Sequence, residues 1–194
     1  MKRVEDYQFI GLLFAALLLF LCNVEANLNY SSIGQLNIGG LFPLHFYDEP
    51  KRTCGSLREI GSLRRMEAMV YAINKINQNT SVLNNISLGY EIYDTCSYPA
   101  ETLKQSLNFI PPYRKASSCE CDNPGKNNSL SNEIIGVVGP QRSSSSVQST
   151  ILLSLYNIPQ VSYLSTSDEL SNDERYPYFL RTVPPDRFQV STVL

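Results

Sequence analysis

Apolar residues along this chain fall into two kinds of segment. A short apolar run, typical of a buried strand, predicts a strand at residues 36–44, and alternating apolar and polar residues predict one at 88–95; further strands are predicted at 134–139, 160–164 and 178–183. Between these runs, apolar residues recur every three or four positions, which predicts helices at residues 62–76, 99–110 and 143–158. Strands that alternate with helices favour a parallel sheet with right-handed crossovers. The sequence therefore predicts an α/β fold.

Several residues mark the expected helix ends. Ser62 is placed to cap the first helix, and Pro99 opens the second, which Pro111-Pro112 stop. The pre-proline position Ile158 ends the third helix. The apolar positions expected to line that helix are Val147, Ile151, Leu152 and Leu155. Residues 113–133, rich in Pro, Gly, Asn and Ser, predict a loop.

Two of the predicted turns are rich in hydroxyl groups. Parallel sheets bind ligands at the carboxyl ends of their strands, and the turns at that edge fall at residues 54–62, 96, 140–143 and 164–168. The serines at 143–146 open a helix, where unpaired N–H groups and the helix dipole favour a carboxylate or phosphate. A helix cap followed by a polar loop is the alternative interpretation. Because both turns lie at one edge of the sheet, ligand binding and helix capping remain two alternative roles for these serines.

The first residues predict export from the cell. Lys2 and Arg3 precede an apolar run at 9–22, and Val24-Glu25-Ala26 offers small residues for cleavage, so residues 1–26 are interpreted as a signal peptide. A membrane anchor is the alternative, but the run is shorter than the roughly 20 residues that span a bilayer. No later segment is apolar enough to cross one. Because exported proteins can be glycosylated, the sequons at Asn29, Asn79, Asn85 and Asn127 are candidate N-glycosylation sites.

Export also makes disulfides possible. Cys22 leaves with the signal peptide, so four cysteines remain and three connectivities are open. Cys54 and Cys96 both lie at the carboxyl edge of the predicted sheet, which makes their pairing the easiest. Cys119 and Cys121 belong to the opposite edge, and a bridge within Cys-x-Cys is strained. They are therefore candidates for an intermolecular disulfide, with two free surface thiols as the alternative.

Composition excludes several functions. The 194 residues carry a formal net charge of −2 and a pI near 5.5, which gives no electrostatic footprint for nucleic acid. The single histidine, His45, follows an apolar run and suits a structural role. The serine run lacks the Gly-x-Ser-x-Gly pattern of a nucleophile elbow, and no spacing suggests zinc. We therefore expect no catalytic residue, no metal and no cofactor.

A series of ordered motifs spans nearly the whole mature chain. They are Gly39–Phe46, Glu67–Met69, Asn85–Gly89, Tyr93–Cys96, Ile158–Tyr163 and Phe179–Pro184. From about Gly34 to Gln189 the chain resembles the start of the extracellular domain of class C G protein-coupled receptors, the metabotropic glutamate and calcium-sensing group. That domain is a two-lobed, periplasmic-binding-protein-like Venus flytrap that closes on an amino acid. The resemblance implies that residues 27–194 are a partial ligand-binding domain, the first lobe.

The resemblance also implies roles for individual residues. Ser143 matches the serine that binds the ligand α-carboxylate, and Ser144 shares the role if the longer serine run shifts the register. Leu164 lies where the family uses a backbone carbonyl, and Thr166 where it uses a hydroxyl and a backbone contact. Arg65 falls where glutamate receptors keep an arginine for the distal carboxylate, a task that suits a bidentate guanidinium.

Two departures leave the subfamily open. Ile60-Gly61-Ser62 stands where glutamate receptors have a tyrosine near this arginine. The Cys119-Glu120-Cys121 segment resembles calcium-sensing receptors, whose paired cysteines link two protomers. The expected ligand is thus a glutamate-like amino acid, with calcium as a second candidate. The expected assembly is a homodimer, or a heterodimer with a related receptor.

The sequence stops at Leu194, just beyond the last first-lobe motif. The resemblance implies that a second lobe, a cysteine-rich stalk and seven membrane helices lie outside it, so a G protein would be reached only through that membrane domain. The expected location is the extracellular side of the plasma membrane, or secreted if the chain ends here. A truncated secreted form that acts as a dimerisation module, and a soluble solute-binding protein, are the alternative interpretations.

Overall fold

The structure is a computed structural model that describes residues 30–58, 60–111 and 133–190, with side chains up to 188. The predicted signal peptide at 1–26 lies outside these ranges. So do four of the residues singled out from the sequence, namely Asn29, Cys119, Cys121 and Asn127.

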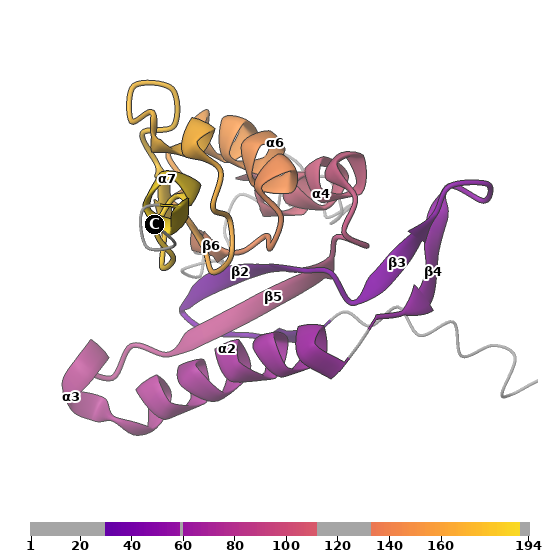
Figure 1. The fold of residues 1–194 in the computed structure, drawn as a ribbon. Coiled ribbons are helices and arrows are strands. Elements are labelled where there is room, and N and C mark those ends of the chain that lie inside the picture. Colours follow the sequence, from indigo (N-terminus) through magenta and orange to yellow (C-terminus); the bar gives the residue numbers. More distant parts are fainter. Residues whose placement is uncertain (1–29, 59, 112–132, 191–194) are drawn as a thin grey trace, which may run out of the picture.

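A six-stranded sheet forms the centre of the described chain, in the order β1-β5-β2-β6-β7-β8 (Figure 1). Its strands are β1 (Tyr30–Ser32), β2 (Leu36–Phe42), β5 (Leu88–Asp94), β6 (Ile134–Val138), β7 (Gln160–Ser162) and β8 (Phe179–Arg181). The short β1 pairs antiparallel with β5, and all the other pairs are parallel. The α/β fold predicted from the alternating segments is confirmed.

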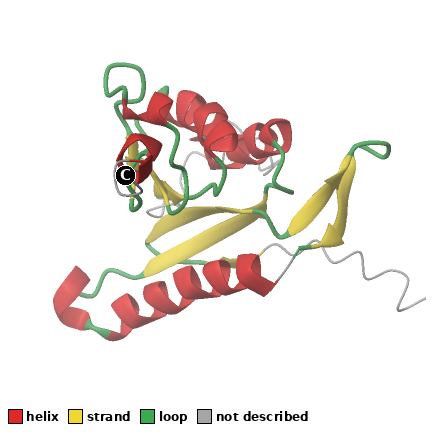
Figure 2. Ribbon diagram, in the orientation of Figure 1, coloured by secondary structure: helices red, strands yellow, loops and turns green. Residues whose placement is uncertain are grey.

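Helices cover both faces of the sheet (Figure 2). The long α2 (Ile60–Gln78) lies on one face, while α4 (Pro99–Ser106), the 3-10 turn η1 (Leu107–Phe109) and α6 (Ser143–Ser154) lie on the other. Three shorter elements complete the set, namely α3 (Thr80–Leu83), the 3-10 turn η2 (Asp168–Ser171) and α7 (Asp186–Val190). The second predicted helix is shorter than expected, since its last residues form η1.

Each face has its own apolar core. Under α2, the buried residues are Phe42, Leu44, Met66, Met69, Ile73, Leu88 and Ile92. Under α4 and α6, they are Leu41, Phe109, Ile110, Ile134, Val137, Leu153 and Ile158. Neighbouring residues of β2 contribute to opposite cores because successive side chains of a strand alternate between its faces. The sheet is thus buried on both sides, as parallel sheets usually are.

Two expectations about helix faces are wrong. Ser62 does not cap the first helix, because α2 begins at Ile60 and Ser62 is buried within it. Of the residues expected to line the third helix, Ile151 and Leu155 are 44% and 73% exposed, and Leu155 lies just beyond the end of α6, although Val147 and Leu152 do pack against core clusters. Hydroxyl side chains take most of the buried face instead, namely Ser145, Ser146, Ser149 and Thr150.

The segment between the first predicted strand and the first predicted helix contains a hairpin. Strands β3 (His45–Asp48) and β4 (Thr53–Leu57) pair antiparallel and project away from the sheet (Figure 1). The Cys54–Cys96 disulfide, predicted from the sequence, joins β4 to the end of β5 with 5.6 Å between the two Cα atoms. The rings of Tyr47 and Tyr98 stack beside it, with centroids 3.9 Å apart. The hairpin is therefore tied to the sheet near its turn, where Cys54 pairs with Tyr47.

Candidate functional site

The serine turn begins where β6 ends. Gly139 has a φ of +96°, and a Cβ there would lie 2.2 Å from the carbonyl oxygen of Leu41. Only glycine accepts this backbone conformation and this approach to β2 without strain. The chain then turns into α6, whose first residues divide by burial. Ser143 is half-buried and Ser144 exposed, whereas the next two serines are fully buried.

The turn that follows β7 meets the start of α6. The backbone N–H of Ser167 donates a hydrogen bond to Oγ of Ser143, with 3.2 Å between the two atoms. Thr166, which precedes Ser167, is half-buried, and Leu164 is 37% exposed. The structure therefore places both hydroxyl-rich turns at one end of the sheet, in direct contact.

A chain of buried hydroxyl groups lies beneath the two turns. Oγ of Ser146 is 2.7 Å from Oγ of Ser165, which is 2.8 Å from Oγ of Ser162. Ser162 in turn lies 2.7 Å from the carbonyl oxygen of Pro140. Ser162 can donate to Oγ of Ser165 or to the Pro140 carbonyl, and Ser165 can donate to the Gln141 carbonyl, so each of these protons has an acceptor. Satisfied polar networks of this kind fix the groups that they join, here α6, β7 and both turns.

A second buried contact joins α6 to β7 below this chain. Ser149 donates to Oε1 of Gln160 at 2.9 Å, and both side chains are fully buried. The sequence analysis missed Ser162, Ser165 and Gln160, because nothing in their spacing separates a buried hydroxyl or amide from an exposed one.

Arg65 reaches the same edge from α2. Its Nη1 donates to Oε1 of Gln141 at 3.2 Å, and its guanidinium carbon lies 5.9 Å from the ring centroid of Tyr163. Burial raises the pKa of Tyr163 above its usual range, while the charges of Arg65 and Arg58 oppose that rise. The phenol thus stays neutral, and a cation from α2 stands beside the serine turn.

An open hollow of about 460 Å³ lies over the serine turn. It is lined by Gln141, Arg142, Ser143, Ser144 and Leu164. Hydroxyl groups, the unpaired N–H groups at the start of α6 and a nearby guanidinium are all donors to an anion. Chemically, this edge can hold a carboxylate at the serines and a second anionic group near Arg65.

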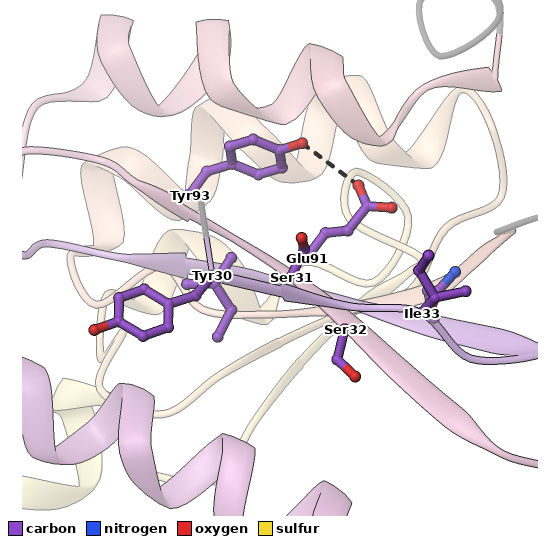
Figure 3. A pocket seen from close by; sticks show the side chains of 8 residues that line it. Tyr30, Ser31, Ser32, Ile33, Glu91 and Tyr93 are labelled. Carbon is purple, nitrogen blue, oxygen red and sulfur yellow. Dashed lines mark hydrogen bonds between the residues drawn. The ribbon is translucent and has the colours of Figure 1, made fainter. Parts of the chain in front are cut away.

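A second cavity, of about 210 Å³, lies at the far edge of the sheet (Figure 3). Residues of β1 and β5 line most of it, and the Tyr93 hydroxyl lies 3.4 Å from Oε2 of Glu91. None of the residues predicted to bind a ligand lines this cavity. It is therefore separate from the serine turn.

The remaining predicted residues lie on the surface or in structural contacts. Asn79 and Asn85 are exposed, and Asn79 caps α3 by accepting a hydrogen bond from the Ser81 N–H. Nδ1 of His45 lies 2.5 Å from Oδ2 of Asp94, whose other oxygen accepts the Leu44 N–H. His45 therefore has a structural partner, as predicted.

The described residues also bear on metal binding and on membrane crossing. One cluster of potential metal ligands, Cys54, Asp94 and Cys96, is present, but its two sulfur atoms form the disulfide. Across the described ranges, no helix combines the length and the apolar character that a bilayer crossing requires.

A parallel sheet whose carboxyl edge presents a helix N-terminus, hydroxyl groups and a cation defines an α/β ligand-binding lobe. Comparison with known families gives the particular family. Residues 64–194, more than half of the chain, match the receptor family ligand binding region, and the chain belongs to that family.

The relatives confirm the resemblance to the extracellular region of class C receptors. The chain is 41% identical to metabotropic glutamate receptor 8 of Homo sapiens over 164 residues, and 37% identical to metabotropic glutamate receptor 4 of Rattus norvegicus over the same length. Each match covers 83% of this chain but 18% of the relative. The chain thus corresponds to about a fifth of the length of a receptor.

Proposed function

We propose that this chain is the N-terminal part of the amino-acid-sensing domain of a class C receptor, and that its lobe holds the ligand α-carboxylate. The contact between Ser167 and Ser143 carries the proposal, because it joins the two hydroxyl turns beside an open hollow. Membership in a receptor ligand-binding family supports it. A carboxylate at the start of α6 would accept N–H and O–H bonds and gain from the helix dipole.

Each residue has a role in this proposal. Ser143 and Ser144 donate to the α-carboxylate, and Thr166 adds its hydroxyl and backbone. The carbonyl of Leu164 accepts from the ligand ammonium group. Arg65 binds the distal carboxylate of a glutamate-like ligand, for which its position beside Gln141 is suited.

The test uses the full-length natural protein that contains this chain, with L-glutamate as the probe. Ser143→Ala and Thr166→Ala should each weaken binding roughly tenfold, since buried hydrogen bonds to charged groups contribute about 1.5–3 kcal/mol. Ser56→Ala, an exposed serine of β4, is the matched control and should leave the affinity unchanged. Titration calorimetry measures the dissociation constants. Unchanged affinity in both site variants would rule out this assignment. Calcium, the second candidate ligand, is titrated in parallel.

We also propose that the receptor functions as a homodimer or as a heterodimer with a related receptor. The layer of α4 and α6 supports this proposal, because it leaves apolar side chains exposed. They are Leu103, Ile151, Leu155 and Tyr156. A bridge through Cys119 and Cys121 would then link the protomers. A secreted short form of the chain would present the same surface and compete for the same partner.

The proposed location is the extracellular side of the plasma membrane. The Cys54–Cys96 disulfide fits an oxidising compartment, and the sequons at Asn79 and Asn85 are exposed for glycosylation. Coupling to a G protein would require a membrane domain beyond this chain. Glycosidase treatment of the expressed protein, followed by electrophoresis, tests export; no change in mobility would argue against it.

A further inference from the structure

The turn that contacts Ser143 is itself held in place by the side chain of an arginine. Arg181, the last residue of β8, is half-buried, and its Nη1 lies 2.9 Å from the carbonyl oxygen of Ser167 and 3.4 Å from that of Ser165. Its Nη2 donates to Oγ of Ser171 at the end of η2. Within the described ranges, no carboxylate forms an ion pair with this guanidinium. Backbone carbonyls of the turn therefore take the place of a counter-ion.

The direction of these carbonyl groups determines where the N–H groups of the turn point. In a trans peptide the C=O and N–H groups point in opposite directions. Because the Ser165 carbonyl is directed at Arg181, the Thr166 N–H points away from Arg181. In the next peptide, the Thr166 carbonyl accepts the Asp186 N–H at 2.8 Å, and the Ser167 N–H points the other way, to Ser143. Two consecutive peptide planes are thus each held through their carbonyl group.

We propose that Arg181 is a positioning residue for the amino-acid site. It holds the carbonyls of Ser165 and Ser167, and so fixes the two peptides that flank the one whose N–H, that of Ser167, contacts Ser143. This inference rests on the proposed function, since the turn and Ser143 are the pair assigned to the α-carboxylate and the α-amino group. A guanidinium suits the task because its planar fork presents several N–H groups in fixed directions.

The experiment compares three variants of the full-length natural protein that contains this chain. Arg181→Gln removes the charge and most of the fork, and should weaken L-glutamate and L-alanine binding by the same factor, about tenfold, because the groups that it positions are common to all amino acids. Arg181→Lys keeps the charge and should retain part of the affinity. Arg175→Gln is the matched control, an exposed arginine paired with Glu169 near the same turn, and should change nothing. A loss confined to L-glutamate, or an equal loss in the control, would overturn the proposal.

A double-mutant cycle separates positioning from general destabilisation. If Arg181 acts through the turn that contacts Ser143, the losses from Arg181→Gln and Ser143→Ala should overlap, and the double variant should bind about as weakly as the worse single one. If Arg181 acts only on overall stability, the two factors multiply, and the proposal fails. Should Ser143→Ala alone have no effect, the proposed function fails instead.

The proposal can still be tested if the Arg181→Gln variant is not exported. If Arg181→Gln fails to reach the cell surface, Arg181→Lys and Ser171→Ala take its place in the same cycle, since Ser171 anchors Nη2 without touching the turn. Either variant should weaken L-glutamate and L-alanine equally while Arg175→Gln does not. Wild-type affinity in both, with normal thermal unfolding, would overturn the proposal.

Discussion

Four consecutive serines open α6, and the helix divides them between two tasks. A helix turns 100° per residue, so neighbours cannot all face one side. Ser143 and Ser144 lie at the hollow, while Ser145 and Ser146 are buried beneath it. The outer pair is therefore available to a ligand, and Ser146 joins the hydroxyl chain that supports the turn.

The contribution of Arg65 to ligand selection follows from its position. It lies beside Gln141 at the rim of the hollow and is well placed for a group distant from the serines. Arg65→Ala should therefore weaken L-glutamate about tenfold and L-alanine hardly at all, since only the former carries a distal carboxylate. Arg64→Ala, its exposed neighbour, is the control. Equal losses for both amino acids would exclude the distal-carboxylate role.

Sequence reasoning found the residues that the turns expose and missed those that hold the turns. Ser143 and Thr166 stand in segments whose hydroxyl content is visible in the sequence. Arg181 belongs to a short strand, and its value depends on carbonyl groups fourteen and sixteen residues earlier in the chain. The fold brings these residues together, so no local sequence pattern predicts the contact.

At the scale of elements, α4 and α6 pack through small hydroxyl residues. Thr102 and Ser106 of α4 are buried and donate to carbonyls of their own helix, to Tyr98 and Thr102 respectively. A hydroxyl satisfied in this way can be buried without a partner on the facing helix. The buried face of α6 is likewise mostly serine and threonine, with Leu153 as its apolar member. Ile151 and Leu155 are thereby left exposed.

Two leucines of the same region test this orientation. Leu153 is fully buried, whereas Leu155, just after the helix, is 73% exposed. Leu153→Ala should lower the free energy of unfolding by about 2–5 kcal/mol through the cavity that it leaves. Leu155→Ala should change it by about 0.5 kcal/mol or less. Chemical denaturation of the mature chain carrying Cys119→Ser and Cys121→Ser, at dilution sufficient to keep it monomeric, measures both. Equal costs would contradict the orientation of α6.

Five of the six strands of the sheet were predicted, whereas β1 and the hairpin were not. Strands β2 and β6 lie in the middle of the sheet and are mostly apolar, and β5 beside them shows alternating apolar residues. Every residue of β4 is exposed, and its sequence shows no alternation. The hairpin depends on contacts made elsewhere, the Cys54–Cys96 disulfide and the stack of Tyr47 on Tyr98.

At the scale of the molecule, the two faces of the lobe differ. Residues 143–154, which form α6, include no charged side chain, although surface helices usually carry charges on their solvent side. The exposed part of α2 includes Arg64, Arg65, Glu67 and Lys75. An uncharged outer face with exposed apolar residues favours contact with another protein. The outer face of α6 is therefore the surface on which we expect a second protomer.

The mature chain secreted from mammalian cells tests this expectation. Non-reducing electrophoresis should show a dimer that Cys119→Ser combined with Cys121→Ser abolishes. In that double variant, light scattering should still detect association, which Ile151→Glu with Leu155→Glu should remove by placing charges in an apolar contact. Tyr71→Glu, an exposed aromatic of α2, is the control and should not affect it. A monomeric parent chain would refute the bridge. Association lost equally in the α2 variant would move the interface away from α6, because the effect would then follow added charge rather than the face that carries it.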